Sequence, residues 1–177
     1  LAAARDWCRD ADPLVRARGL ELASRLGRAG FDLIWGALED RDAATRHAAI
    51  QLAARKLPAA RLLEGVAVEA NSALRTACID ALKQKGAPAV PVLRRGTTSE
   101  DPDVVLFTLQ ILGSMPEEEV APILLGFISH PDLNIAQVLV QNRASLALPV
   151  LPDLVKRRGV TVKKKSPSVL MMVNLYS

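Results

Sequence analysis

A helical sequence pattern returns along this chain at intervals of about 30 residues. Equivalent dipeptides begin at residues 15, 45, 74, 104 and, less regularly, 134, so the intervals are 30, 29, 30 and 30 residues. A fixed period of this size is typical of a stacked array, in which no single unit can bury its own apolar face. The period therefore predicts a row of packed repeats in place of a single globular core.

Each repeat is predicted to contain two helices, and the second helix begins at a capping residue. The caps, which can accept hydrogen bonds from free N–H groups of the first helical turn, are Asp12, Asp42, Asn71, Asp101 and, in the fifth copy, Asp132. Apolar residues then follow at steps of three and four, on one stripe.

Small residues recur on that stripe and let neighbouring helices approach closely: Gly19, Ala49, Cys78 and Thr108. A large side chain at Ala49 is expected to push the repeats apart. Pro122 and Pro152 are expected inside first helices, which they should bend.

The residues at these positions resemble HEAT repeats, most closely the short variety of roughly 30 residues named after phycobilisome lyases. The resemblance covers about residues 1–156 and is carried by Asp-Pro-Leu-Val-Arg (12–16), Asp-Pro-Asp-Val-Val (101–105) and the Pro-x-Leu elements at 91–93 and 122–124. It departs from the family pattern at Val105 and Ile135, where arginine would stand. The family implies an all-α fold, a right-handed α-solenoid of about five to six helical hairpins, with an inner surface that binds proteins.

Domain organisation follows the extent of the pattern. We expect a repeat array over residues 1–158 and a tail over 159–177, which either caps the array or begins a following domain. The chain lacks a run of about 18 apolar residues, so no membrane span is expected. The first residues lack the layout of a signal peptide. Cys8 and Cys78 stand far apart and are interpreted as small core residues of a protein in a reducing compartment. A cytoplasmic protein of bacterial or archaeal type is therefore expected.

An arginine recurs four residues after the cap in the first three repeats, at Arg16, Arg46 and Arg75. The resemblance implies a structural role, in which each arginine pairs with the capping residue of the next repeat and fixes the angle between repeats. The acceptors would be Asp42, Asn71 and Asp101. Binding of a phosphate or a nucleic acid is the alternative.

A second set of polar residues is predicted to line the inner face, on the second helices. The candidate partner-binding residues are Glu21, Arg25, Gln51, Arg55, Asp80, Lys83 and Gln84. Basic residues also gather near the ends of these helices, where they complement the helix dipole or form a basic strip. The net charge changes along the chain, from +5 over residues 1–96 to −7 over 97–155 and +6 over 156–177.

No motif in the sequence carries catalytic chemistry. His47 and His130 have no ligand partner at metal spacing, and no nucleophile stands with a base and an orienting group. We therefore expect no enzyme activity, no cofactor and no metal, and a non-catalytic scaffold that binds a protein partner through its inner face. The alternatives are nucleic-acid binding, as in HEAT-like DNA glycosylases, and a subunit related to bilin lyases.

Overall fold

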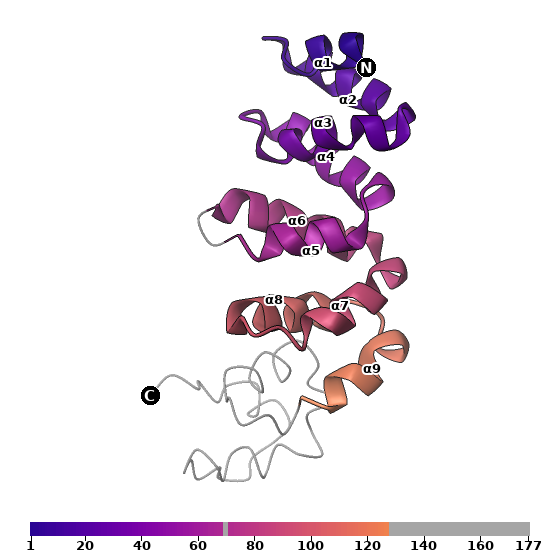
Figure 1. Ribbon diagram of the computed structural model, residues 1–177, viewed down its shortest axis with the longest axis vertical. Helices are drawn as coiled ribbons and strands as arrows, with labels where there is room; N and C mark the ends of the chain where they lie inside the picture. Colours follow the sequence, from indigo (N-terminus) through magenta and orange to yellow (C-terminus); the bar gives the residue numbers. More distant parts are fainter. Residues whose placement is uncertain (69–70, 128–177) are drawn as a thin grey trace, which may run out of the picture.

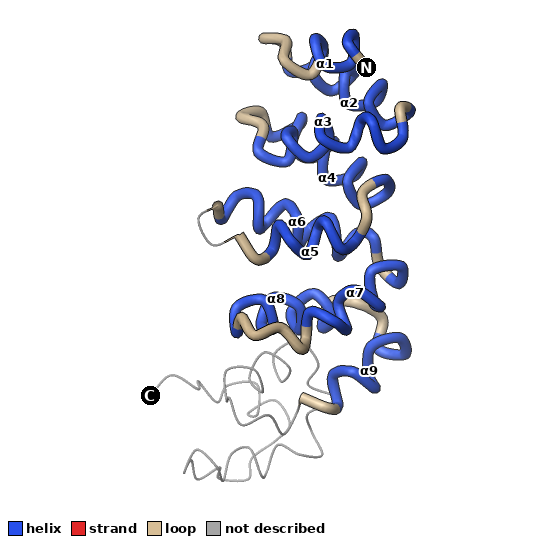
Figure 2. Tube along the Cα trace, viewed as in Figure 1, coloured by secondary structure: helices blue, strands red, loops and turns tan. Residues whose placement is uncertain are grey.

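The computed structural model describes residues 1–68 and 71–127, and all regular structure in these ranges is helical (Figure 2). The α-helices are α1 (Ala2–Trp7), α2 (Pro13–Arg25), α3 (Phe31–Gly36), α4 (Ala43–Lys56), α5 (Ala59–Val66), α6 (Ser72–Lys85), α7 (Val90–Gly96), α8 (Pro102–Gly113) and α9 (Glu117–Leu125). Short 3-10 helices lie at η1 (Gly27–Gly30), η2 (Ala37–Glu39) and η3 (Ala87–Ala89). The prediction of an all-α protein is confirmed for this part of the chain.

Successive helices pair and the pairs stack in chain order along the long axis (Figure 1). The pairs are α1 with α2, α3 with α4, α5 with α6 and α7 with α8, and α9 follows as the next first helix. The second helices pack on one another in the sequence α2, α4, α6, α8, while α5, α7 and α9 pack in a parallel row. This arrangement is the helical solenoid expected from the 30-residue period.

The predicted caps begin the four second helices of the described chain. Aspartate and asparagine side-chain oxygens accept hydrogen bonds from backbone N–H groups two or three residues ahead, at 2.8–3.0 Å. The caps are Asp12, Asp42, Asn71 and Asp101. Each satisfies a donor that the first helical turn leaves without an intrahelical partner. The fifth cap, Asp132, lies outside the described residues.

The core runs through the whole stack, between the two rows of helices. It is built from aliphatic side chains that are almost fully buried, such as Leu20, Ile34, Leu82 and Leu112. The small positions of the second helices are also buried, with Ala49, Cys78 and Thr108 at 0% exposure. A Cβ atom on Gly19 would lie 2.6 Å from the backbone nitrogen of Cys8, so α1 and α2 touch through their backbones. The expected close approach is thus present.

Other predictions concern residues that the structure describes only in part. Pro122 lies inside α9, as expected. The fifth second helix, Pro152 and the boundary between residues 158 and 159 lie outside the described residues. Among the helices at 1–68 and 71–127, none has the length and hydropathy required to cross a lipid bilayer.

Candidate protein-binding surface

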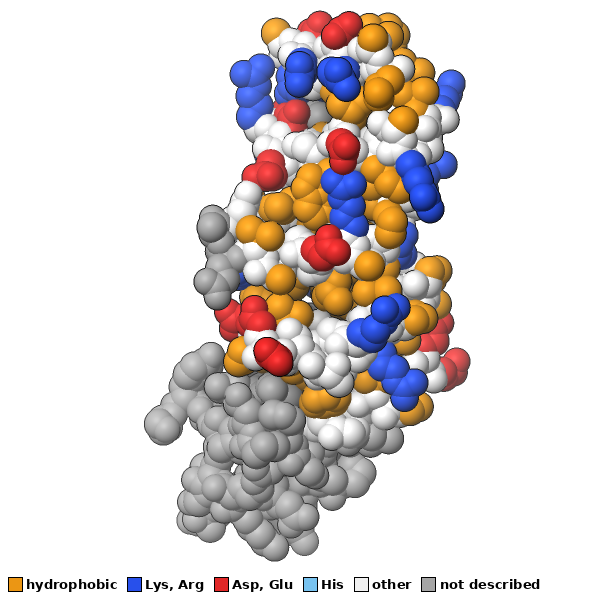
Figure 3. All heavy atoms as spheres, viewed as in Figure 1, with side chains coloured by type: hydrophobic (Ala, Val, Ile, Leu, Met, Phe, Trp, Pro, Cys, Tyr) orange, Lys and Arg blue, Asp and Glu red, His pale blue; other side chains and the backbone are white. Residues whose placement is uncertain are grey.

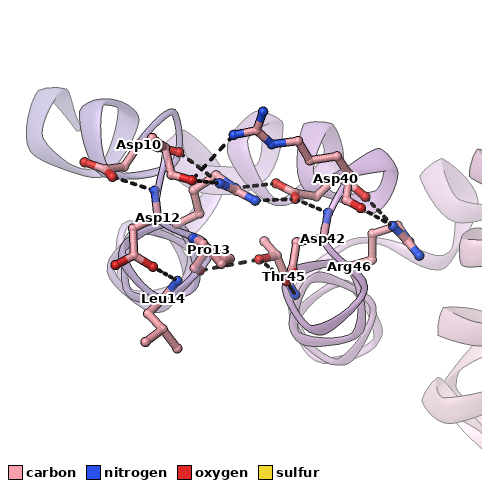
Figure 4. A network of polar contacts seen from close by, with 11 residues as sticks. Asp10, Asp12, Pro13, Leu14, Asp40, Asp42, Thr45 and Arg46 are labelled. Atoms are coloured by element: carbon pink, nitrogen blue, oxygen red, sulfur yellow. Dashed lines mark hydrogen bonds and ion pairs between the residues drawn. The ribbon is translucent and has the colours of Figure 1, made fainter.

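The first repeat is joined to the second by a buried ion pair between Arg16 on α2 and Asp40 in the turn before α4 (Figure 4). Arg16 Nε donates to Asp40 Oδ2 and Arg16 Nη2 donates to Oδ1, both at 2.8 Å. Arg16 Nη1 also donates to the backbone oxygens of Asp10 and Ala11 at 2.9 Å. The two side chains are only 6% and 12% exposed. A bidentate pair of this kind fixes both distance and orientation between neighbouring repeats.

The predicted acceptor for Arg16 was wrong by two residues. One carboxylate oxygen of Asp42 is occupied by the helix cap, because Oδ1 accepts from Thr45 N at 2.8 Å and from Thr45 Oγ1 at 2.9 Å. Those hydrogen bonds lower the pKa of Asp42. Asp40 stands outside the helix, and its Oδ1 also accepts from Asp42 N at 2.8 Å. Burial raises the pKa of Asp40, but the hydrogen bonds from Arg16 and Asp42 N outweigh it, so the net shift is downward.

The other two arginines do not reach the predicted acceptors either. Arg46 Nη1 donates to the backbone oxygens of Asp40 at 2.6 Å and of Arg41 at 3.1 Å. Arg75 Nη2 donates to Val68 O at 3.0 Å, and its guanidinium lies over the Phe107 ring, 5.1 Å from the centroid. Arg75 Nε is buried and has no partner in the described chain.

For Arg75 the difference has a simple cause in the sequence. Asp40 stands two residues before the cap of the second repeat and 24 residues after Arg16. The residue two positions before the cap Asp101 is Ser99, which carries no carboxylate, whereas the residue two positions before Asn71 is Glu69, which lies outside the described residues. Asn71 and Asp101 act as caps through Leu74 N and Asp103 N. Among the described residues, Arg16 therefore has a carboxylate partner, Arg46 contacts backbone oxygens, and Arg75 contacts a backbone oxygen and an aromatic ring.

The Arg16–Asp40 pair should make the folding stability of the chain depend on pH. Because the pKa of Asp40 is lower in the folded chain than in the unfolded chain, its stabilisation is complete above a pH of about 4 and is lost as the pH falls through the folded value. We expect Asp40→Asn to melt several degrees lower than the unmodified chain at neutral pH, and the difference to shrink towards about pH 3. Thermal melts followed by circular dichroism across this pH range measure both effects.

The matched control is Asp32→Asn. Asp32 also pairs with an arginine, Arg61 on α5, at 2.8 Å, but its side chain is 84% exposed. Exposed ion pairs contribute little, so this variant should melt within a degree or two of the unmodified chain. Equal losses in the two variants would contradict the special role of the buried pair.

The candidate partner-binding residues lie on the solvent side of three second helices that pack side by side. Glu21 and Arg25 are exposed on α2, Gln51 and Arg55 on α4, and Lys83 and Gln84 on α6, while Asp80 is half-buried. Local contacts hold some of them: Arg18 Nη1 pairs with Glu21 Oε2 at 3.2 Å, and Gln51 Nε2 lies 2.8 Å from His47 Nε2. The sequence thus located a continuous polar surface, although its use in binding stays a prediction.

Basic side chains follow one edge of the stack, where each second helix turns into the next first helix. In the space-filling view they run along one side of the molecule (Figure 3). We call five exposed residues here the basic rim: Arg25, Arg28, Arg55, Lys56 and Lys83. Lys85 does not belong to it, because its Nζ donates to Ala54 O at 2.5 Å, at the end of α4. Burial lowers the pKa of Lys85.

The described residues hold no cluster of histidine, cysteine, aspartate and glutamate side chains able to bind a metal ion. Cys8 and Cys78 are free thiols, as their sequence separation predicted. Burial, together with the charge of Glu39, raises the pKa of Cys78 to about 12. Its thiol is therefore protonated and unreactive at neutral pH.

The sequence predicted that Trp35 packs in the core or between repeats, but it did not predict that Arg61 joins two first helices. Arg61 on α5 pairs with Asp32 on α3, and its guanidinium lies over the Trp35 ring, 5.0 Å from the centroid. A Cβ atom on Gly65 would overlap Cys78 Sγ and lie 2.8 Å from Trp35 Cη2, so the indole lies against the glycine backbone. The recurrence of glycine at residues 65 and 96 was the available signal.

The match to a known family agrees with this geometry over just under half of the chain. Residues 59–144 match the family model of HEAT repeats. A shorter stretch is similar to two proteins of Escherichia coli (strain K12). The multidrug export protein AcrF is 47% identical over 55 residues, which are 31% of this chain and 5% of AcrF. The multidrug resistance protein MdtF is 42% identical over 57 residues, which are 32% of this chain and 6% of MdtF. The chain therefore spans only about a twentieth of the length of these relatives.

Proposed function

Because residues 59–144 match the family model of HEAT repeats, we propose that the chain is a non-catalytic scaffold that binds a protein partner. The array is proposed to be right-handed, to contain five to six helical pairs of the short variety, and to act in the cytoplasm. HEAT repeats generally serve as protein-interaction scaffolds. The similarity to the two export proteins covers too small a part of either to extend their activity to this chain.

The observation that carries this proposal is the continuous polar surface on α2, α4 and α6. Neighbouring second helices pack directly on one another, so equivalent residues of successive repeats lie in rows. One such row contains Glu21, Gln51 and Asp80, and another contains Arg25, Arg55 and Gln84. The second row changes from charged to neutral along the array, so it distinguishes the two directions in which a partner can lie. Charge patterns of this kind favour one orientation and one partner.

Charge reversal of the rim tests the proposal. We expect the double variant Arg25→Glu plus Arg55→Glu to lose at least about tenfold in affinity for the partner, because opposite charges across an interface become like charges. The partner would first be identified by pull-down with the unmodified chain and mass spectrometry. Its affinity for each purified variant would then be measured by surface plasmon resonance.

The control is Arg5→Glu plus Arg9→Glu, which makes the same change of charge at exposed residues of the first repeat outside the second helices. This variant should keep its affinity. If the rim variant binds as well as this control, and both melt as the unmodified chain does, the polar surface of the second helices is not the binding surface.

The basic rim also supports the alternative of nucleic-acid binding. Its five cations would make binding to duplex DNA weaken steeply as salt rises. A titration of labelled duplex against the chain at several salt concentrations separates the two proposals. Affinity that is negligible at low salt, combined with retained protein binding, would leave only the scaffold.

A further inference from the structure

An open groove of about 420 Å³ lies between the first helices α5 and α7. Its walls are mainly apolar and include Ala60 and Leu63 of α5, Val92 and Gly96 of α7, and Val104 of α8. At the level of α5 and α7, Figure 3 shows hydrophobic atoms interspersed with acidic and basic side chains. None of the residues proposed above for partner binding lies in this groove.

At the same interface one repeat earlier, between α3 and α5, a tryptophan occupies the space between the two first helices. There Trp35 of α3 reaches across to Gly65 of α5, and the Asp32–Arg61 pair covers the indole.

At the α5–α7 interface the corresponding contact is made by Leu63. A Cβ atom on Gly96 would lie 3.2 Å from Leu63 Cδ2 and 2.6 Å from Thr108 Oγ1, just as one on Gly65 meets Trp35 and Cys78. Leucine is much smaller than tryptophan. The arginine that covers the ring is also replaced. Arg61 stands four residues before Gly65, whereas the residue four positions before Gly96 is Val92. The groove is therefore the space that an indole occupies one repeat earlier.

Charged residues at the groove determine which charge a ligand can carry next to an aromatic ring bound there. Glu64, Asp101 and Arg95 are among the lining residues, so two carboxylates stand against one guanidinium. One oxygen of Asp101 accepts from Asp103 N as the cap of α8, whereas the exposed Glu64 makes no ion pair with a described residue. A cation next to the bound ring would reproduce the arrangement of Arg61 over Trp35.

From this geometry we infer that the groove between α5 and α7 binds an aromatic side chain, a tryptophan above all, that a partner protein presents next to a basic residue. The inference rests on the proposed function, since it names a chemistry for the partner. It adds a second contact surface, on the row of first helices, to the polar surface of the second helices. Burying a large ring supplies most of the affinity and the basic neighbour adds orientation.

The test uses the full chain and the dipeptide probe N-acetyl-Trp-Arg-amide. Binding is followed by NMR from the backbone signals of Val92 and Gly96. We expect saturable shifts with a dissociation constant on the order of 1 mM, which is ordinary for a ligand of this size. N-acetyl-Ala-Arg-amide should bind at least about tenfold more weakly, and N-acetyl-Trp-Glu-amide about threefold more weakly.

Two variants fill the groove from the protein side. Leu63→Trp restores the tryptophan of the earlier interface, and Ala60→Trp adds the ring at an exposed lining residue, which keeps the test valid if the first variant does not fold. Both should lose binding of the probe. Ala44→Trp, at an exposed residue of α4, is the matched control and should keep it.

Equal binding of the alanine and tryptophan probes, absence of shifts at Val92 and Gly96, or full binding by Ala60→Trp would each overturn the inference. None of these results tests protein binding at the basic rim. The Arg25→Glu plus Arg55→Glu variant should bind the probe normally, so a failure of the groove and a failure of the proposed function give different results.

Discussion

Replacement of Gly30 with alanine is expected to lower the free energy of unfolding by about 3 kcal/mol or more. Gly30 is buried at the end of η1, where the chain turns from α2 into α3. A Cβ atom there would overlap the carbonyl oxygen of Ala23 and lie 2.7 Å from its carbonyl carbon. These are backbone atoms of α2, so the clash cannot be relieved by rotation of a side chain. The first and second repeats would have to separate.

The matched control for this prediction is Gly36→Ala. A Cβ atom on Gly36, at the end of α3, meets nothing within 4 Å. Alanine has the higher helix propensity, so this variant should be unchanged or more stable by up to about 1 kcal/mol. Urea titration and thermal melts measure both. Similar melting of the two variants would show that the turn between α2 and α3 is looser than this packing implies.

The regular features of the fold were predictable because they depend on local chemistry that recurs. A cap needs only an aspartate or asparagine with free N–H groups ahead of it, and the four caps from Asp12 to Asp101 were located correctly. The apolar stripe and its small residues follow from helical spacing, and Cys78 and Thr108 are buried as that spacing requires. A period of 30 residues then leaves stacking as the way to bury those stripes.

The contacts between repeats were less predictable, because they depend on which side chain stands at one position in one repeat. Arg16 has a carboxylate 24 residues ahead and Arg75 has Ser99 there, so equivalent arginines make different contacts. The expected pairing with the caps overlooked that a capping carboxylate is already occupied by backbone N–H groups.

The α5–α7 groove was missed for a similar reason. Trp35 and Leu63 both count as apolar in a periodic pattern, and only their sizes separate a filled interface from an open one. The candidate residues of the second helices are exposed apart from the half-buried Asp80, since exposure follows from the helical period. The helical period does not predict the chemistry of the partner surface that these residues would contact.

Replacement of Ala49 with leucine is expected to lower the free energy of unfolding by about 3 kcal/mol, which is the second large effect. Ala49 lies in the middle of α4 and is 0% exposed. Its equivalents show what surrounds it. Gly19 faces the backbone of Cys8, and Cys78 and Thr108 face the glycines at 65 and 96. The equivalent glycine for Ala49 is Gly36, where a Cβ atom meets nothing within 4 Å, so this contact is looser. Ala49 is nevertheless fully buried in a helix that packs on α2, α3 and α6, and three additional carbon atoms cannot be accommodated without moving a neighbouring helix.

Ala44→Leu is the control, because Ala44 is exposed in the first turn of the same helix. It should change the free energy of unfolding by no more than about 0.5 kcal/mol. Small-angle X-ray scattering adds a test that stability alone does not provide. If Ala49 sets the spacing between the two rows of helices, Ala49→Leu should increase the radius of gyration under native conditions, whereas Ala44→Leu should not. Because α4 packs against both α2 and α6, the displacement would pass to the repeats on either side. A chain that accepts the leucine with unchanged stability and dimensions would have its spacing set elsewhere, by the Arg16–Asp40 pair and by the contact of Trp35 with Gly65.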